Sequence, residues 1–328
     1  MPGDVTVIIP NWNGAGRLER ALDSLAAQTT PPALILVVDN GSTDGSADAA
    51  AARGAAVLSL ERNYGFSRAV NEGVSASVTE WVAIVNNDVV LERQWLERLL
   101  AAAQGMQFAV PLLVNLRDPA RLDGCFDLLA RSGCAWRAGN GMPDAPRFRQ
   151  PRQVSSPPLT AALLRRDLFQ SLGPLDDRFE SYMEDVEFGL RCTLAGMMGA
   201  YCPEAVARHE GSATLGAWSS AMVELISRNQ VLLIAKHYPP GWFRRMGLAV
   251  LTGQLLWGAL ALKHGAGWAW LKGKWRGLRA WSQFRSTPSA NTAETIERCL
   301  LSSEGEIRKL QQGQDAEAYW SVYFRLAR

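Results

Sequence analysis

Four polar clusters in this 328-residue chain have residue types that fit the binding of a phosphorylated ligand and a cation. They are residues 10–13 (PNWN), 39–42 (DNGS), 86–88 (NND) and the adjacent pair Glu184-Asp185. The first three each end an apolar run that we predict to be a strand. Because the carboxyl ends of strands in an open α/β sheet meet at one ligand-binding crevice, we expect these clusters to form a single site.

Asp88 is the candidate metal ligand, because a carboxylate after a strand suits Mg²⁺ or Mn²⁺ bridged to substrate phosphates. His209 follows the last predicted strand and offers a nitrogen ligand, which suits Mn²⁺ better than Mg²⁺. A simple strand-to-helix turn at 86–88 and a surface or capping role for His209 are the alternatives. The chain has no GxxxxGK[ST] loop, and no GxGxxG after its first strand. A P-loop NTPase or a dinucleotide oxidoreductase would therefore lack its phosphate-binding loop.

The pair Glu184-Asp185 stands at the start of a predicted helix. Acids in a first turn are favoured by the helix dipole, which is the structural explanation. The functional one is that one of the two is a general base, which deprotonates an acceptor hydroxyl while a metal stabilises a departing diphosphate.

The elements that position these residues alternate between strand and helix. Apolar β-branched runs predict strands at 5–9, 33–39, 55–63 and 80–88, and helical periodicity predicts helices at 16–28, 47–54 and 65–77. Strands apolar on both faces are typical of a parallel sheet covered on both sides. We therefore predict an α/β fold with a doubly wound, mostly parallel sheet. Residues 111–158, with seven prolines, predict a loop-rich region with one or two edge strands. A strand and short helix (159–173), a helix (184–196) and a last strand leading to His209 complete a catalytic domain at 1–215, followed by a helical region at 216–328.

The C-terminal region has an unusual composition. No Asp or Glu occurs between Glu224 and Glu294, whereas ten Lys or Arg residues and six of the twelve tryptophans do. Its core, MGLAVLTGQLLWGALALK, is short for a spanning helix, which needs roughly 20 residues. Tryptophan and basic residues beside an apolar helix are typical of the membrane interface, and a basic surface attracts anionic lipids. We expect peripheral attachment to the membrane; a spanning helix, or a buried helix of a soluble subdomain, is the alternative.

Composition limits the remaining classes. A hydrophobic content of 48% with 20% charged residues indicates a globular chain rather than a disordered one. Five scattered cysteines without a CxxC pair favour a reducing compartment over zinc or a disulfide framework. The start, MPGDVTVIIP, shows no secretory pattern, so we expect a cytoplasmic protein on the inner face of the membrane. Nucleic-acid binding is disfavoured, because the tryptophans flank an apolar helix instead of an exposed basic stripe.

Five segments in order, VTVIIPNWNGAGRLERALDSLAAQT, LVVDNGSTDGS, NYGFSRAVNEG, VNND and YMEDVEFGLR, resemble the inverting family-2 glycosyltransferases with the A-type fold. The resemblance covers roughly residues 4–212 and is greatest to the rhamnosyltransferase-like branch, which the segment RNQVLLIAKHYP also resembles. It implies a metal-dependent inverting enzyme of cell-surface polysaccharide synthesis. The donor would be a dTDP- or UDP-linked sugar such as rhamnose, and the acceptor a saccharide linked to a polyprenyl diphosphate.

The resemblance also implies roles for single residues. It places the nucleotide-sugar at Pro10, Trp12, Asp39, Asn63, Gly65, Asn71, Asn86 and Asn87. Asp39 would bond the pyrimidine ring, Asp88 and His209 would hold Mn²⁺ or Mg²⁺, and Asp185 would be the catalytic base with Glu184 beside it. Asn86 stands where a first carboxylate is often found, which removes one charge from the metal site.

Two other functions stay open at this point. A nucleotidyltransferase that makes sugar nucleotides has a similar sheet and metal carboxylate, but needs a Gly-rich basic loop after the first strand, and PNWNGAGRLER is a poor one. A catalytically inactive, membrane-associated scaffold would keep the fold without binding any nucleoside diphosphate.

Overall fold

The computed structural model describes residues 4–211, 216–286, 290–313 and 315–327, and the chain divides into two compact units. The first, here called the sheet unit, comprises residues 1–126 and 139–214; the second, the helical unit, comprises 127–138 and 215–328. The predicted domain boundary at residue 215 falls in 212–215, outside the described residues. Residues 127–138, which we expected in the catalytic domain, belong to the helical unit, where Arg131 pairs with Glu304 at 2.8 Å.

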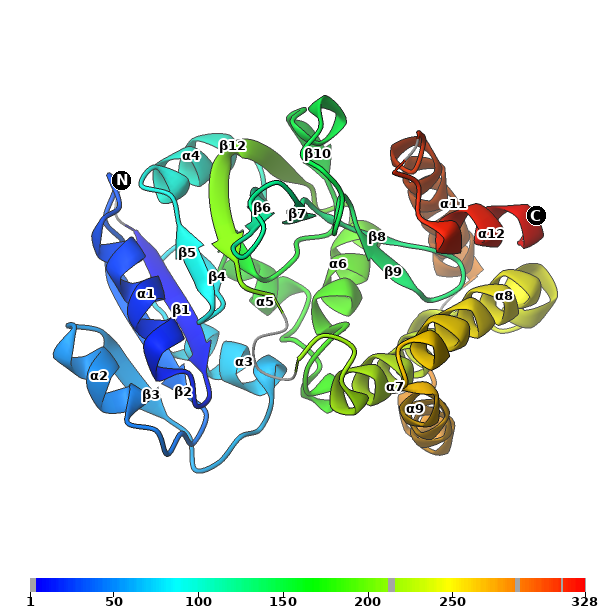
Figure 1. Ribbon diagram of the computed structural model, residues 1–328, viewed down its shortest axis with the longest axis horizontal. Coiled ribbons are helices and arrows are strands. Elements are labelled where there is room, and N and C mark those ends of the chain that lie inside the picture. Colours follow the sequence, from blue (N-terminus) through cyan, green and yellow to red (C-terminus); the bar gives the residue numbers. More distant parts are fainter. Residues whose placement is uncertain (1–3, 212–215, 287–289, 314, 328) are drawn as a thin grey trace. The chain divides into compact units, whose positions relative to one another are not determined.

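The amino-terminal half of the sheet unit is a parallel sheet with helical crossovers (Figure 1). Its strands β1 (Val5–Asn11), β2 (Leu34–Asp39), β3 (Ala56–Ser59) and β4 (Trp81–Val85) lie in the order β3-β2-β1-β4. Helices α1 (Ala15–Ala26), α2 (Ser46–Ala52) and α3 (Phe66–Ala76) connect them. The central strands β1 and β4 are buried on both faces, whereas the edge strand β3 is partly exposed. Val7 and Ile9 join a core cluster with residues of α1 and of α4 (Trp95–Ala102), whereas Ile8 faces α3. A Cβ at Gly73 of α3 would lie 2.4 Å from Ile8 Cγ2, so only glycine lets this helix approach the sheet.

The carboxyl-terminal half of the sheet is mixed. Strand β11 (Ala161–Arg165) lies between β4 and β6 (Phe108–Asn115) and is antiparallel to both, and β12 (Gly199–His209) is parallel to β6. The short strands β5 (Val89–Leu91) and β10 (Arg152–Val154) pair with β12, and β7 (Leu122–Gly124) pairs with β6, all antiparallel. The predicted α/β class with doubly wound architecture is confirmed. The antiparallel strand β11 is the strand that we predicted within 159–173, whereas β7 and β10 lie in the region 111–158 that we expected to be mostly loops.

Four short helical segments complete the sheet unit: η1 (Pro146–Phe148), α5 (Asp167–Ser171), η2 (Asp177–Phe179) and α6 (Glu184–Leu194). Helix α6 starts at the predicted pair Glu184-Asp185. Its Glu187 is fully buried and pairs with Arg191 at 2.9 Å, and Arg191 also donates to the carbonyls of residues 172–174. This clamp holds α6, and so the carboxylate pair at its start, against the preceding turn.

The helical unit contains the hairpin of β8 (Asp127–Leu129) and β9 (Ala135–Arg137) and six helices within its described residues. The helices are α7 (Ser220–His237), α8 (Trp242–Lys263), α9 (Gly267–Arg279), α10 (Trp281–Phe284), α11 (Ala290–Leu310) and α12 (Ala318–Leu326). Helices α7 and α9 pack through glycine, because a Cβ at Gly273 would lie 2.3 Å from the Glu224 carbonyl oxygen. By length and composition alone, one helix in the described part of the chain, α8, is suited to cross a membrane.

Candidate active site

The predicted strand-end residues of β1, β2 and β4 converge through one asparagine that sequence reasoning did not single out. Asn11 lies beside Asp39 in the β1–β2 register and is 2% exposed. Its amide nitrogen donates to Asp39 Oδ1 at 3.3 Å and to Ser46 Oγ at 2.8 Å, while its Oδ1 accepts from Asn87 Nδ2 at 2.7 Å. Asn11 therefore joins the expected pyrimidine-binding Asp39 to the Asn-Asn-Asp segment.

Pro10 and Trp12 flank Asn11, and both are half-buried. The next residue, Asn13, has a left-handed backbone (φ 47°), and its Oδ1 accepts from Thr43 N at 2.9 Å. Asn13 N in turn donates to Ser42 Oγ at 2.9 Å. The loop after β1 is thus tied to the loop after β2, and this holds the two loops together at the strand ends.

The segment after β3 is held by the side-chain amides of Asn63 and Asn40. Asn63 Oδ1 accepts from Gly65 N at 2.9 Å, and Asn40 bonds the backbone of Tyr64 and Gly65, at 3.0 Å each. Asn71 of α3 lies elsewhere: its amide donates to Leu175 O at 2.8 Å and accepts from Leu175 N at 2.9 Å. Asn71 therefore anchors α3 to the turn before η2, which is a positioning role. Asn40, which lies in the quoted polar cluster, is the residue that fixes the loop.

Asp88, His209 and Asp123 form a buried charged group. His209 Nε2 lies 3.2 Å from Asp88 Oδ1, and Nδ1 lies 2.8 Å from Asp123 Oδ2. Each of the three residues is less than 10% exposed. Burial by itself lowers the pKa of His209, but the two carboxylates outweigh it and raise that pKa to about 10. Asp123 was missed because it lies in the proline-rich region, 35 residues after Asp88, and carries no motif.

These residues fit a divalent cation. A carboxylate bonded to one ring nitrogen of histidine is the usual arrangement that orients the other nitrogen toward a metal, and Asp123 stands in that place. Asn86 adds an amide oxygen, Oδ1, that is buried without a hydrogen-bond partner among the described residues. Within the described part of the chain, no group of three or more His, Cys, Asp or Glu side chains is arranged to hold an ion. Asp88 and His209 would thus be the protein ligands, with phosphate oxygens completing the set.

A strained loop precedes the candidate base. Glu180, Tyr182 and Met183 all have left-handed backbones, with φ of 63°, 69° and 71°. Such conformations cost free energy in residues other than glycine and cluster at functional sites. At the start of α6, Asp185 is half-buried and its Oδ1 accepts from Val186 N at 2.8 Å, whereas Glu184 is 6% exposed.

Tyr182 lies close enough to both Glu184 and Asp88 for their charges to affect its phenol. Burial, followed by the negative charges of Glu184 and Asp88, raises the pKa of Tyr182 to about 12. Both carboxylates therefore act on the same phenol.

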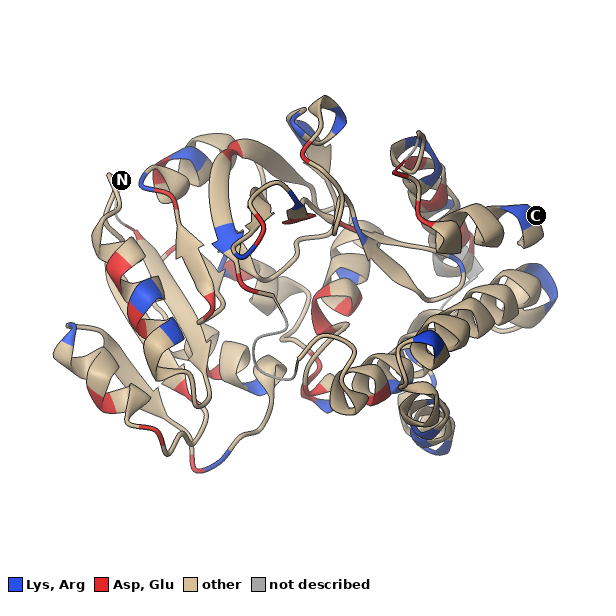
Figure 2. Cartoon of the chain, viewed as in Figure 1, with Lys and Arg blue, Asp and Glu red and all other residues tan. Residues whose placement is uncertain are grey.

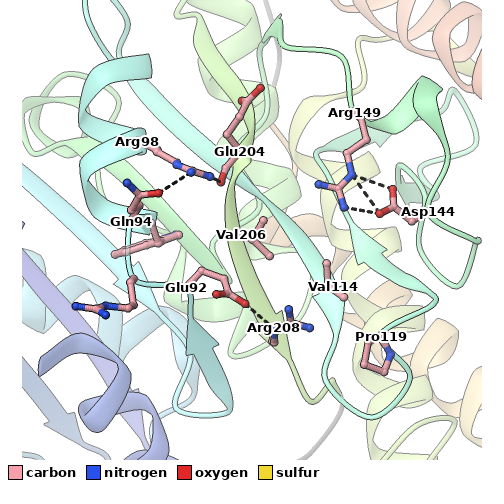
Figure 3. Close-up of a pocket in the computed structure, with 12 residues that line it drawn as sticks. Glu92, Gln94, Arg98, Val114, Pro119, Asp144, Arg149, Glu204, Val206 and Arg208 are labelled. Carbon is pink, nitrogen blue, oxygen red and sulfur yellow. Dashed lines mark hydrogen bonds and ion pairs between the residues drawn. The ribbon is translucent and has the colours of Figure 1, made fainter. Parts of the chain in front are cut away.

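A separate groove on the sheet unit is about 460 Å³ in volume (Figure 3). Charged side chains line it, and several of them bond to one another or to the backbone. Arg208 pairs with Glu92 at 2.9 Å, Arg149 binds Asp144, and Arg98 donates to the Glu204 carbonyl. Successive side chains of a strand point to opposite faces, so Arg208 faces away from its neighbour His209. The groove is therefore distinct from the strand-end site.

Comparison with known proteins identifies the family of the chain. Residues 6–173 match the family described as "Glycosyl transferase family 2". The chain belongs to this family. It is 30% identical over 278 residues to the N-acetylglucosaminyl-diphospho-decaprenol L-rhamnosyltransferase of Mycobacterium tuberculosis, covering 76% of this chain and 89% of the relative. It is also 28% identical over 205 residues to the O-antigen biosynthesis protein RfbC of Myxococcus xanthus, covering 59% of this chain and 16% of that protein.

A solved structure has a similar fold. The crystal structure of GalNAc-T7 with UDP, GalNAc and Mn²⁺ superposes with a TM-score of 0.60 at 14% identity, covering 85% of this chain and 56% of that one. As a family-2 member the chain is a glycosyltransferase. The predicted membership and enzyme class, with similarity to a rhamnosyltransferase, are confirmed.

Proposed function

We propose that this glycosyltransferase moves L-rhamnose from a nucleoside diphosphate to a saccharide carried on a polyprenyl diphosphate, in cell-surface polysaccharide synthesis. The observation that carries the proposal is the similarity to the N-acetylglucosaminyl-diphospho-decaprenol L-rhamnosyltransferase, which extends over 89% of the length of that relative. The name of RfbC, an O-antigen biosynthesis protein, supports the polysaccharide context. The donor would be dTDP- or UDP-linked, since a carboxylate such as Asp39 can bond the ring of either pyrimidine.

The donor would lie across the strand ends. Asp39 would bond the base, and the loop fixed by Asn40 and Asn63 would close over the nucleoside. Asp88 and His209 would hold Mn²⁺ or Mg²⁺, and the Mn²⁺ in the GalNAc-T7 structure supports this choice. Such a cation, when bound, would offset the negative charge on the departing diphosphate. Asn86 and Asn87 would line the diphosphate side of the site.

Asp185 would accept the proton of the acceptor hydroxyl as that oxygen attacks the anomeric carbon. Its half-exposed position, beside the fully engaged Glu187 and the buried Glu184, supports this assignment. The attack forms the new C–O bond and breaks the bond to the diphosphate in a single displacement, so the product has the inverted anomeric configuration. Glu184 would lie beside the acceptor.

We also propose that the enzyme works at the inner face of the cytoplasmic membrane. A polyprenyl-linked acceptor resides in the bilayer, so a catalytic unit must be held at the surface to reach it. The apolar helix α8 and the basic, acid-free composition of 225–293 support attachment through the helical unit.

The test is a transfer assay. The purified protein would be incubated with Mn²⁺ and with N-acetylglucosaminyl-diphospho-polyprenol as the acceptor. The donor would be radiolabelled dTDP-rhamnose in one reaction and radiolabelled UDP-glucose in another. We expect label to move from dTDP-rhamnose to the lipid. Release of pyrophosphate from a nucleoside triphosphate, without lipid labelling, would instead indicate a nucleotidyltransferase, and an absence of any turnover or nucleotide binding would indicate a scaffold.

A further inference from the structure

Helices α8 and α9 of the helical unit expose large apolar side chains. The larger apolar side chains that α8 exposes include Leu248, Leu251, Leu255 and Leu262, and all of these are more than half exposed. Their spacing of three, four and seven residues puts them on one face of the helix. In a soluble protein the apolar face of a helix normally packs against the core, so the exposure of this face requires an explanation.

Helix α9 carries a second set of exposed apolar side chains. Trp268, Leu271, Trp275 and Leu278 form a second line, with exposed fractions of 78%, 49%, 56% and 62%. The two helices pack where Gly258 of α8 meets the indole of Trp270, because a Cβ at Gly258 would lie 2.7 Å from that ring. We call these eight residues, four on α8 and four on α9, the apolar face.

Two polar side chains of the same helices, Gln254 and Lys274, are turned inward. Gln254, which interrupts the apolar sequence of α8, donates to Ser132 O at 2.8 Å and also contacts Lys274. The Lys274 amine donates to Ser227 O at 3.0 Å and to Gln230 Oε1 at 2.7 Å. Gln254 is thus satisfied inside the unit, and it does not enter the exposed line of leucines.

Basic residues border the apolar face. Lys272, Arg276 and Arg279 form a line along α9 beside its tryptophans, and Arg279 lies 4.5 Å from the Trp275 ring centroid. Arg244 and Lys263 are exposed near the two ends of α8. Basic residues mark both ends of this helix (Figure 2). Neither helix contains an acidic residue, and only Glu224 of α7 pairs with this basic line among the described residues, at 2.8 Å from Lys272 and 2.5 Å from Arg276. The border therefore matches an anionic surface.

We propose that the apolar face enters one leaflet of an anionic bilayer, with α8 and α9 lying in the plane of the membrane. This deepens the membrane attachment proposed above and rests on it. At 1.5 Å per residue, the 13 residues of α9 span about 20 Å, too short to cross a hydrocarbon layer of about 30 Å. Its line of Lys272, Arg276 and Arg279 would enter the hydrocarbon if both helices were upright. When both helices lie in the plane of the membrane, these cations contact the lipid headgroups while the leucines and tryptophans reach the acyl chains.

Vesicle flotation with the full-length protein tests the occupant of the face. Vesicles of phosphatidylcholine with 30% phosphatidylglycerol should bind the protein, and neutral vesicles should bind it more weakly, by about fivefold for each cation engaged (on the order of 1 kcal/mol per charge). The triple variant Leu251→Gln, Leu255→Gln, Trp275→Gln should lose at least about tenfold in binding. The matched control is Val78→Gln, at 88% exposure in the sheet unit, with unchanged binding expected.

Titration with dTDP or UDP is run on every variant, because it reports on the donor site and not on the membrane. Unchanged nucleotide affinity with lost flotation supports the proposal. Equal flotation of wild type and triple variant overturns it, whatever the nucleotide result. A wild type that dimerises in solution and does not float, with a monomeric triple variant, also overturns it, because a second copy then covers the face. If the wild-type protein does not bind nucleotide, this would count against the proposed function, and the flotation result would still test the membrane attachment by itself.

Depth measurements separate lying from spanning. Cysteines would be placed singly at Leu248, Leu255 and Leu262 in a Cys299→Ser background, labelled with a fluorophore, and quenched by lipids brominated at known depths. Helix α8 in the plane predicts the same shallow depth at all three positions. A deep middle position between two shallow ends would show a spanning helix and contradict the proposal.

Discussion

Asp123 Oδ2 lies 2.8 Å from one ring nitrogen of His209, and the other ring nitrogen faces Asp88 at 3.2 Å. This relationship makes Asp123 a positioning residue for the proposed metal site. The loop that holds Asp88, the short strand β7 that holds Asp123 and the end of β12 are all needed to assemble it, so the site exists only in the folded sheet unit.

Replacing Asp123 by Asn should weaken metal binding without removing a ligand. Loss of the charge that orients the imidazole typically costs about 10- to 100-fold in metal affinity. The measurement is the Mn²⁺ dependence of nucleotide binding by calorimetry. Asp118→Asn, at an exposed carboxylate of the neighbouring turn, is the control. Equal Mn²⁺ affinity in both variants would show that Asp123 has only a structural role.

Replacing Asp185 by Asn should stop transfer while donor binding stays near the wild-type value. Removal of a general base costs about 10²- to 10⁴-fold in rate. The comparison is kcat for sugar transfer against the dissociation constant for the donor nucleotide, with the exposed Asp177→Asn as the control. Retention of more than a few per cent of kcat would refute the base assignment.

Gly65→Ala should disturb the loop that precedes the catalytic pair. A Cβ at Gly65 would lie 2.7 Å from Glu180 O, an atom that also accepts from Ser67 N at 3.0 Å. The segment 180–183 must then shift, and we expect kcat to fall at least about tenfold, as small misplacements of catalytic groups do. Gly54→Ala separates this effect from backbone strain, because Gly54 also has a left-handed backbone (φ 81°) but nothing within 4 Å. Similar losses in the two variants would mean that strain alone is responsible.

Lys274 should make stability depend on pH. Burial lowers its pKa to about 7, whereas the unfolded chain has the ordinary value near 10.5. Between these values the unfolded state binds one more proton, so the free energy of unfolding should rise as pH increases from about 7 to 10. Urea denaturation across this range should show a steeper rise for wild type than for Lys274→Met. Parallel curves for the two proteins would contradict the inference.

Much of the fold was predictable because β1 to β4 are apolar on both faces, which is a local signal. The position of β11 between β4 and β6 was not, since it depends on pairing between strands about 50 to 80 residues apart in sequence. A proline-rich sequence that suggested loops also contains β6, whose Pro111 is accommodated within the sheet.

The position of a candidate side chain was predictable where the residue ends or closely follows a strand, as Asp39, Asp88 and His209 do. Asn11 and Asp123 act on other side chains through the fold, and a single sequence carries no sign of such partners. Asn71 shows the opposite case: its spacing fits the nucleotide segment, but both ends of its amide bond the backbone of Leu175.

The most direct test of the account is calorimetric titration of the purified protein with dTDP and UDP, with and without Mn²⁺, in wild type and Asp88→Ala. The account predicts a dissociation constant on the order of micromolar that requires Mn²⁺ and is lost in the variant. The stronger of the two nucleotides would identify the donor class. Failure of the wild-type protein to bind either nucleotide in the presence of Mn²⁺ would contradict the proposed donor site and the sugar transfer built on it.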